Sequence, residues 1–282
     1  MTGAVGTRAL GLAHNDPSRG STALLTFSRA FCVPRDADAA GVACVVDGAS
    51  LLSHQRLDTG ASLSSVVGTP KGHAVVAQFS TPRELRPNGA FETASRGPFR
   101  ARAWAAAVVG GPQDPDEAAA ARERLVASLP DPLRRCLVGK SEGEAWFLAV
   151  LSVLHRRGLL ERTGEGVGAV LGAVAEVDDG RHPRHLTLTN GVDLIHFARG
   201  FPSVIVRVAG LDDAVAAQVN PLLADSSTAR ERNRRYVGTF CVGALDAPLR
   251  SDAALPSGCE VVFRFADGGA CVVRRDLVPK SL

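Results

Sequence analysis

Lysine and aromatic residues are scarce in this 282-residue sequence. Of its 32 basic residues only Lys71, Lys140 and Lys280 are lysines, aromatic residues make up 5% of the chain, and the net charge is +3. The densest basic cluster lies at 230–235, where four arginines are followed by the single tyrosine, Tyr236. A nucleic-acid-binding face needs such clusters to be repeated, with aromatic residues between them. The sequence therefore excludes nucleic acid as the main partner and predicts a solvated helix face at this cluster.

Long apolar runs are also absent. No stretch reaches the roughly 18 apolar residues that a membrane-spanning helix requires, which argues against a membrane partner. Residues 1–16 contain no basic stretch followed by an apolar core, so no secretory signal is predicted. The chain is 45% hydrophobic and 22% charged, as is usual for a soluble globular protein. We therefore expect a cytoplasmic protein with a sizeable core.

The six cysteines form no Cys-x-x-Cys pair, and no histidine lies at metal-ligand spacing from any of them. Cys44, Cys241 and Cys271 lie in apolar runs, where cysteine acts as a small core residue. His182 and His185 flank a Pro-Arg dipeptide, but a metal site would need a third ligand that the sequence does not offer. A disulfide framework is not expected in a chain of this length without a secretory signal. No metal and no cofactor are predicted.

Short apolar runs bounded by turn residues dominate the sequence and predict β-strands. Helical patterns are fewer: 116–128 follows a proline, 143–157 has an apolar face with acidic residues at its start and arginines at its end, and 164–177 is glycine-rich. Strands come first, helices follow, and strands return, an order that indicates an α+β domain with antiparallel sheets and external helices. The predicted strands are 40–46, 74–79, 103–109, 185–188, 194–198, 204–208, 236–242, 260–265 and 270–274.

Local signals add two hairpins and a helix cap. Asn190-Gly191 lies between two predicted strands and is typical of a type I′ turn. Residues 266–269, Ala-Asp-Gly-Gly, separate the last two predicted strands and indicate a second hairpin. Ser141, three residues before Glu144, predicts a capping box at the start of the long helix.

Five segments, in order along nearly the whole chain, resemble motifs of the compact class II glutamine amidotransferases. Residues 38–43 resemble the family's Asp-Gly-Trp-Gly-Ile-Ala strand entry, and residues 97–104 resemble its His-Pro-Phe loop and the strand that ends in His-Asn-Gly. Residues 139–144 resemble its Thr-Asp-Ser-Glu helix start, and residues 186–199 resemble its Leu-Thr-Asp-Gly hairpin ending in arginine. Residues 242–258 resemble, more weakly, Val-Ala-Ser-Glu-Pro-Leu followed by Val-Pro-Pro-Gly. The order and spacing carry the resemblance.

This resemblance implies a fold and a domain organisation. The family fold is of the N-terminal-nucleophile type, a four-layer αββα sandwich of mostly antiparallel sheets between outer helices. We therefore expect a single domain over residues 1–282. The strand that contains Thr7–Ala13 is expected at the centre of a sheet, and the helix at 143–157 on an outer face.

The resemblance also locates the family's nucleophile, an N-terminal cysteine whose own α-amine serves as the base. No cysteine precedes Cys32. Thr2 would be exposed by removal of the initiator methionine. Thr7 fits the register better, because residues 7–11 resemble the family's Cys-Arg-Leu-Leu-Gly start, but its exposure needs cleavage after Gly6. A threonine with a free amine can act as a nucleophile, whereas the alternative is that both are ordinary terminal residues.

The other family site positions have changed as well. Val109 stands where an asparagine donates to the tetrahedral intermediate, a loss that typically costs about 10²–10³ in rate, while the Gly110 backbone N–H is retained. Ser80 replaces the arginine that grips the glutamine α-carboxylate. Glu142 replaces the aspartate that binds the substrate ammonium, or is an ordinary carboxylate of a first helical turn. Phe99, in the Gly-Pro-Phe loop, completes the predicted substrate-binding set.

These changes predict negligible glutaminase activity, because such groups act as a unit. Two functional classes remain open. One is an enzyme that performs amide or ester chemistry, acyl transfer or hydrolysis, on a less polar small-molecule substrate with an N-terminal threonine; Phe79, Val108 and Val109 are predicted to line its pocket. The other is a catalytically silent pseudoenzyme that acts as a binding or scaffold protein. The oligomeric state is left open by the sequence.

Overall fold

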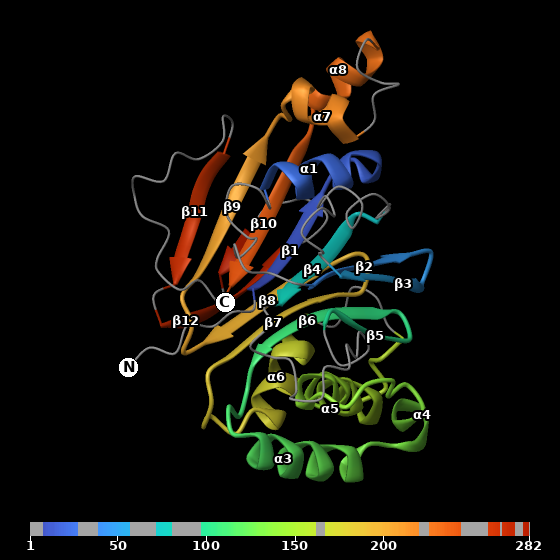
Figure 1. Ribbon diagram of the computed structural model, residues 1–282, viewed down its shortest axis with the longest axis vertical. Coiled ribbons are helices and arrows are strands. Elements are labelled where there is room, and N and C mark those ends of the chain that lie inside the picture. Colours follow the sequence, from blue (N-terminus) through green and yellow to red (C-terminus); the bar gives the residue numbers. More distant parts are fainter. Residues whose placement is uncertain are drawn as a thin grey trace.

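Two antiparallel sheets lie face to face at the centre of the molecule (Figure 1). The computed structural model describes residues 8–27, 39–56, 72–80, 97–161, 167–219, 226–243, 259–265, 267–273 and 279–281. No helix in these ranges is long and apolar enough to cross a membrane.

The first sheet has β1 (Arg8–His14) at its centre, as predicted. Residues Ala9–Ala13 carry no polar side chain and are buried, which suits a strand covered on both faces. β1 is hydrogen-bonded between β10 and β4, each antiparallel to it. The order across this sheet is β11 (Cys259–Phe265), β9 (Ser203–Ala209), β10 (Val237–Gly243), β1, β4 (Ala74–Ser80), β2 (Ala39–Val46) and β3 (Ala49–Arg56).

The second sheet contains the pair of strands predicted around Asn190-Gly191. The order across it is β13 (Pro279–Ser281), β12 (Gly268–Val273), β8 (Leu194–Arg199), β7 (Arg184–Thr189), β6 (Trp104–Gly110) and β5 (Phe99–Ala101). All of its neighbouring strands are antiparallel.

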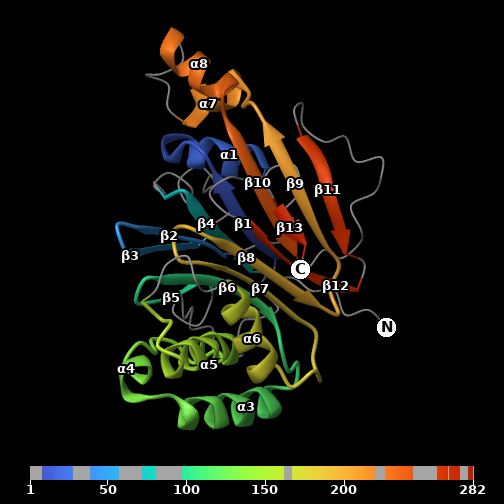
Figure 2. The ribbon, with the colours of Figure 1, turned by 180° about the vertical axis from the view of Figure 1, so that it is seen from behind.

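Helices cover the outer face of the second sheet (Figures 1 and 2). α5 (Glu142–Arg156) is nearly all buried and packs with α6 (Val167–Val177) over the strands in one apolar cluster. α3 (Pro115–Ser128) lies outside α5 and buries none of its residues, and the short α4 (Asp131–Arg134) follows it. The predicted helices at 116–128 and 143–157 are therefore confirmed, with the long one on an outer face.

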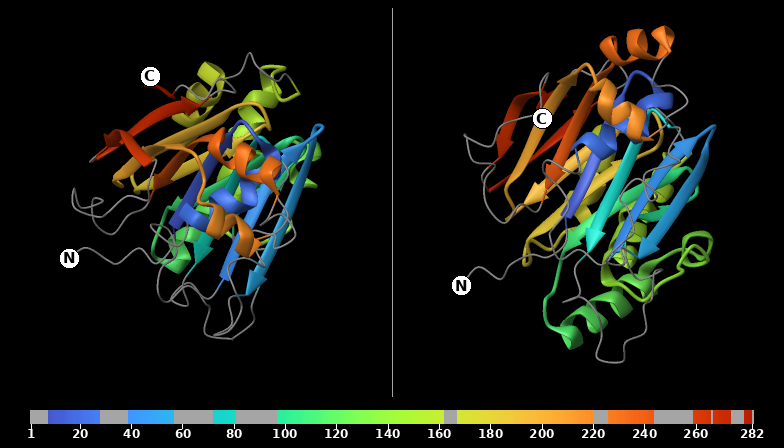
Figure 3. Two further views of the ribbon diagram at one scale, coloured as in Figure 1. Left: turned by 90° about the horizontal axis from the view of Figure 1, so that it is seen from above. Right: turned by 45° about the horizontal axis from the view of Figure 1, so that its top comes forward.

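A second group of helices covers the outer face of the first sheet (Figure 3). α1 (Gly20–Phe27) follows the short 3₁₀ turn η1 (Pro17–Arg19) and packs its leucines onto β1 and β4. α7 (Asp213–Val219) lies against α1, and α8 (Ser227–Arg234) follows. The arginines of 230–235 are exposed on and after α8, as the solvated-face prediction expected. With helices outside both sheets, the α+β four-layer sandwich is confirmed.

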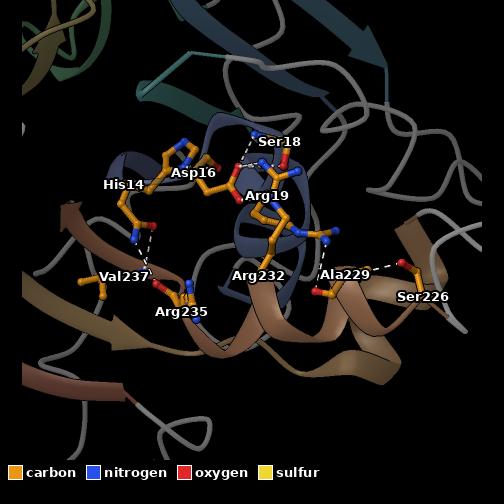
Figure 4. Close-up of polar contacts among 10 residues, drawn as sticks. His14, Asp16, Ser18, Arg19, Ser226, Ala229, Arg232, Arg235 and Val237 are labelled. Atoms are coloured by element: carbon orange, nitrogen blue, oxygen red, sulfur yellow. Dashed lines mark hydrogen bonds and ion pairs between the residues drawn. The ribbon is translucent and has the colours of Figure 1, made fainter.

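Polar contacts join α8 to the end of β1 (Figure 4). Asp16 accepts hydrogen bonds from Ser18 and forms an ion pair with Arg232, with Nε and Oδ2 3.0 Å apart. The buried Arg19 donates to the Ala229 carbonyl at 3.2 Å. Asn15 donates to the Arg235 carbonyl at 3.0 Å. Two segments more than 200 residues apart in sequence are therefore held together by side-chain contacts.

The predicted hairpin at 266–269 is wrong. The strands on either side of it belong to different sheets, since β11 pairs with β9 while β12 pairs with β8 and β13. Gly268 has φ +127° and lies opposite Arg199, so its conformational freedom serves the crossing between sheets. Turn chemistry is local and does not specify the sheet in which the next strand pairs.

The type I′ turn predicted at Asn190-Gly191 is also wrong, although the hairpin exists. Thr189 lies opposite Leu194, so four residues form the loop, and the Asn190 side chain accepts from the N–H groups of Val192 and Asp193. The two-residue turn of this kind is Asp47-Gly48, with φ of 51° and 77° and Val46 opposite Ala49. This Asp-Gly signal was present in the sequence and would have predicted β3.

Candidate functional site

One end of the space between the sheets holds Val109 and the first residues of β1. In the first sheet Ala9 lies opposite Gly243 on one side and Gln78 on the other. In the second sheet Val109 lies opposite His185. Ala9 and Val109 belong to the same buried apolar cluster between the sheets, and a methyl group on Gly243 would overlap the His185 ring. The start of β1 and the end of β6 therefore meet here.

Two histidines are fully buried at this end. His185 Nε2 and His196 Nδ1 are 3.2 Å apart, so one ring donates its N–H to the other, and the Thr187 hydroxyl lies 3.4 Å from His185. Burial lowers the pKa of His196 to about 3, and burial together with the nearby His196 lowers that of His185. Both rings are neutral, and within the described residues His185 Nδ1 and His196 Nε2 have no hydrogen-bond partner. Whichever ring donates, one donor and one acceptor nitrogen are left over.

The backbone N–H groups at the end of β6 point alternately towards β7 and away from it. The Val108 N–H donates to the Gln78 side-chain oxygen at 3.1 Å, and the Gly111 N–H donates to the Pro183 carbonyl at 3.0 Å. Successive N–H groups along a strand point to opposite sides. The Gly110 N–H therefore points to the same side as that of Val108, away from β7. Gly110 itself has φ +92°, which favours glycine there.

The apolar residues proposed to line one pocket do not lie together. Phe79 belongs to the cluster under α1, Val108 to the cluster under α5, and Val109 to the cluster between the sheets. Alternation along a strand explains this, since neighbouring residues face opposite sides of a sheet. The prediction that these three side chains form a single pocket is wrong.

Glu142 lies on the helix side of the second sheet, in the first turn of α5. Both of its oxygens accept hydrogen bonds from Arg184, at 2.7 and 2.8 Å, and the two side chains are only 8% and 5% exposed. The Arg184 guanidinium also stacks over the Trp146 ring, 4.8 Å from its centroid. Phe99 packs beside the same helical turn, close to Gly143. The structure thus places Glu142 and Phe99 on one side of the sheet and Val109 on the other.

Ser80 is the last residue of β4 and is 2% exposed, opposite Ala39. By alternation with Val76 it faces the space between the sheets, on the same side as Val109. Thr2 and Thr7 lie outside the described residues. The five predicted site positions within the described residues are therefore divided between the two faces of the second sheet.

Comparison with known proteins bears on the fold. No protein-family model and no curated protein matches the sequence. Among solved structures, a glutamine aminotransferase class-II domain protein from Silicibacter pomeroyi matches over 97% of this chain and 98% of its own, with 14% identity and a TM-score of 0.53. The molecule has the class II glutamine amidotransferase fold.

Two larger proteins share this fold over part of their length. A glutamine phosphoribosylpyrophosphate amidotransferase from B. subtilis, solved with ADP and GMP, matches with 11% identity and a TM-score of 0.54. The allosteric regulatory enzyme of purine biosynthesis matches with 10% identity and a TM-score of 0.56. Each match covers 97% of this chain, which spans about half the length of these two proteins, 49% and 48%.

Within this fold the start of α5 departs from the predicted capping box. Ser141 caps the helix by accepting from the Glu144 N–H at 3.1 Å, as predicted. The Glu144 carboxylate instead accepts from the N–H groups of Val138 and Gly139, at 2.9 and 2.8 Å. Burial is the largest influence on Glu144 and raises its pKa. The bond from the Ser141 N–H to the Glu144 carboxylate that would complete a capping box is therefore replaced by hydrogen bonds from the preceding loop to that carboxylate.

Sequence reasoning missed Arg184, Trp146 and the His185–His196 pair. Arg184 is 42 residues from Glu142, and no local pattern indicates such a partner. His185 and His196 both lie in predicted strands, and their pairing across the hairpin depends on the register of β7 with β8. Within the described residues no three His, Cys, Asp or Glu side chains group closely enough to hold a metal ion.

Proposed function

We propose that this protein performs amide or ester chemistry, acyl transfer or hydrolysis, on a substrate other than glutamine, with Thr7 as its N-terminal nucleophile. The observation that carries the proposal is the Gly110 N–H, which ends β6 beside the start of β1 and points away from β7. A backbone N–H at such a position can stabilise the oxyanion of an acyl-transfer intermediate. The resemblance of residues 7–11 to the family's N-terminal segment supplies the nucleophile.

The proposed reaction uses the chain terminus as its own base. Thr7 directly precedes Arg8, the first residue of β1. After cleavage behind Gly6, the threonine hydroxyl oxygen attacks the carbonyl carbon while the α-amine, with a pKa near neutral, accepts the hydroxyl proton. The amine or alcohol leaves with that proton, and water or a second acceptor takes the acyl group from threonine. Because Val109 stands where the family has its asparagine donor, one backbone N–H, that of Gly110, would stabilise the oxyanion. Slow turnover is therefore expected.

The substrate class follows from the groups that no longer fit glutamine. Ser80 offers no charge for a carboxylate, and Val109 offers no donor. Both oxygens of Glu142 hold Arg184, so a substrate ammonium would have to displace a bidentate pair. Breaking such a buried pair leaves an uncompensated charge and costs about 3–5 kcal/mol. A less polar acyl compound without the two charged ends of an amino acid is the better match.

The test is a comparison of two matched variants, Thr7→Ala and Thr2→Ala. Intact-mass measurement first establishes whether residues 1–6 are removed. The wild-type chain is then treated with p-nitrophenyl acetate and butyrate, and the acylated residue is located by peptide mass spectrometry. We expect acylation at Thr7, loss of labelling in Thr7→Ala, and unchanged labelling in Thr2→Ala. Ammonia release from glutamine is expected to be negligible throughout.

Three outcomes would count against this proposal. Labelling that persists in Thr7→Ala would move the nucleophile to Thr2 or to another residue. A mature chain that keeps residues 1–6 would remove Thr7 as an N-terminal nucleophile. Glutamine turnover at the rate of an ordinary amidotransferase would reject the proposed loss of the glutamine site.

The alternative is a catalytically silent protein that keeps the fold as a binding or scaffold partner. The Glu142–Arg184 pair favours it, because Arg184 already occupies both oxygens of Glu142 and stacks on Trp146, so this position is filled without any substrate. A chain that retains residues 1–6 and shows no acylation by either ester would select this alternative.

A further inference from the structure

A cleft of about 310 Å³ lies at the end of the sandwich where β1 ends, opposite to the candidate site at the start of β1. Three connections meet around it: the turn between β2 and β3, the residues just before β4, and the loop between β7 and β8. The loop and the end of β2 are in contact, since a side-chain atom added to Gly191 would lie 3.0 Å from Val45 Cβ. The two sheets therefore form this cleft together.

The charge in the cleft is a single carboxylate. Among the described residues that line it, Asp47 is the one acidic side chain, and none is an arginine or a lysine. Asp47 is exposed in the turn before β3, and no described residue forms a hydrogen bond or ion pair with it. An aspartate is common in such a turn without any ligand, so the rest of the lining decides what the carboxylate can do.

His73 adds a second acceptor. Its Nδ1 is bonded to the His14 carbonyl at 3.2 Å, and a carbonyl only accepts, so in the neutral ring Nδ1 carries the proton and Nε2 carries a lone pair. His73 is half-buried, and Nε2 is not among the enclosed side-chain atoms of the described residues, unlike Nε2 of His14. No described residue donates to it. The backbone thus fixes an acceptor that a ligand in the cleft can reach.

The backbone donors of the β7–β8 loop are already used. The Gly191 N–H donates to the Thr189 hydroxyl at 2.9 Å, and the Val192 N–H donates to the Asn190 side-chain oxygen at 3.0 Å. Pro17, on the side of η1, has no N–H. The side chains and this loop therefore offer acceptors and one negative charge, so an anion would find neither a cation nor a loop donor to hold it. A cation that donates hydrogen bonds is the complementary ligand.

The walls favour an organic cation over a metal ion. Val45, Val46 and Val192 present hydrocarbon around the two acceptors, and Val192 is 39% exposed. Within the described part of the chain no three His, Cys, Asp or Glu side chains group closely enough to hold a metal ion. An ammonium group has three donors and needs no such set, and a short alkyl chain suits the valines.

We propose that this cleft binds a small primary amine, whose ammonium group is held by Asp47 and by Nε2 of His73 and whose alkyl body lies against the valines. The site is independent of the acyl chemistry proposed above, because it lies at the other end of β1. It gives the protein a second ligand-binding region, formed by the connections of both sheets.

The experiment is an NMR titration of the whole protein with butylamine at about pH 8, where free imidazole is neutral. Butyrate is the probe of opposite charge and butanol the uncharged one. Asp47→Asn removes the charge and keeps a residue suited to the turn, with the exposed Asp116→Asn on α3 as its control. His73→Asn keeps a donor for the bonded carbonyl and removes the acceptor. Val192→Lys places an ammonium beside the cleft, and Val138→Lys, 78% exposed before α5, is its control.

We expect saturable butylamine binding that shifts the amide signals of Gly191 and Val192. It should weaken about tenfold in Asp47→Asn and in Val192→Lys, and severalfold in His73→Asn, while both controls bind as the wild type does. Butyrate and butanol should not saturate. Circular dichroism checks that each variant is folded.

Several results would overturn the proposal. One is the absence of saturable butylamine binding up to about 10 mM, a free energy weaker than about −3 kcal/mol. Equal binding of butyrate or butanol, or undiminished binding by Asp47→Asn, would do the same. Lys71 is the residue before Gly72 in the sequence, so Lys71→Gln tests the chain's own ammonium as the occupant. Binding that occurs in Lys71→Gln and not in the wild type would replace the ligand site with an internal ion pair.

Discussion

The two ends of β1 surround their buried histidines in different ways. At its far end the ring Nδ1 of His14 is hydrogen-bonded to the Asp16 carbonyl. The Arg232–Asp16 ion pair and backbone groups of α8 complete the network shown in Figure 4. At its start the inter-sheet histidines His185 and His196 are bonded mainly to one another and are enclosed by apolar side chains and Gly243. The first arrangement fastens a helix to the sheet. The second keeps two neutral rings in the core, each with one nitrogen that has no hydrogen-bond partner among the described residues, and such unpartnered groups cost free energy.

The largest expected effect is a loss of stability in acid. Burial lowers the pKa of His14 to about 4 and that of His196 to about 3, and it also lowers the pKa of His185. The unfolded chain takes up these protons near pH 6.5, so stability is fully present above that pH and is lost as the pH falls towards the folded values. Each pH unit below the unfolded pKa lowers the free energy of unfolding by about 1.4 kcal/mol per histidine, so each histidine lowers it by about 2 kcal/mol at about pH 5. Urea unfolding at about pH 7.5 and pH 5 measures the difference.

Two variants measure how much of this acid-induced loss of stability comes from each end of β1. His196→Gln should remove part of the acid loss at the inter-sheet end, and His14→Gln part of the loss at the far end. The matched control is the same substitution at an exposed histidine, His155→Gln. The Glu144 carboxyl acts in the opposite direction because burial raises its pKa, so its contribution to stability falls as the pH rises. An unfolding free energy that is equal at both pH values would show that the histidines are not buried as neutral groups.

A smaller effect is expected from Gly243→Ala, which tests the close packing at the inter-sheet end. The new methyl group would overlap the His185 ring, and His185 is held by its bond to His196. Overpacking of this kind costs about 1–3 kcal/mol. Gly168→Ala is the control, since nothing lies within 4 Å of the added atom on α6, and it should be neutral or slightly stabilising. Equal denaturant midpoints for both variants would show that the ring can move aside.

The same comparison shows which features the sequence could predict. β1 contains a continuous apolar run and β4 begins with one, and their place at the centre of a sheet follows from burial on both faces. β3 was missed because it carries polar residues and exposes Leu51, although the Asp-Gly turn before it was a usable signal. Which sheet receives β12 could not be predicted, because that choice depends on the packing of both sheets.

For the candidate site, the resemblance to the family assigned individual positions but did not show which side chains contact one another. It assigned Val109 and Glu142 to family positions, and only the structure shows that they lie on opposite faces of one sheet. The Glu142–Arg184 pair joins the starts of α5 and β7, so it depends on how a helix docks on a strand. A pair of this kind leaves no periodic signal in the sequence. The same holds for His185 and His196, whose contact depends on hairpin register.

The smallest expected effect concerns the ion pair of the far end, tested by Arg232→Gln. Burial acts to raise the pKa of Asp16, but hydrogen bonds from Ser18 and the charge of Arg232 outweigh it and lower the pKa. The Arg232 side chain is 53% exposed, so solvent screens much of this attraction, and exposed pairs contribute about 0–1 kcal/mol. We expect a loss of less than about 1 kcal/mol that diminishes further at high salt, with Arg230→Gln as the matched control. The buried Arg19–Ala229 contact and the bonds of Asn15 would continue to hold α8. A loss of several kcal/mol would mean that this single ion pair, instead of the hydrogen bonds around it, fastens α8 to the end of β1.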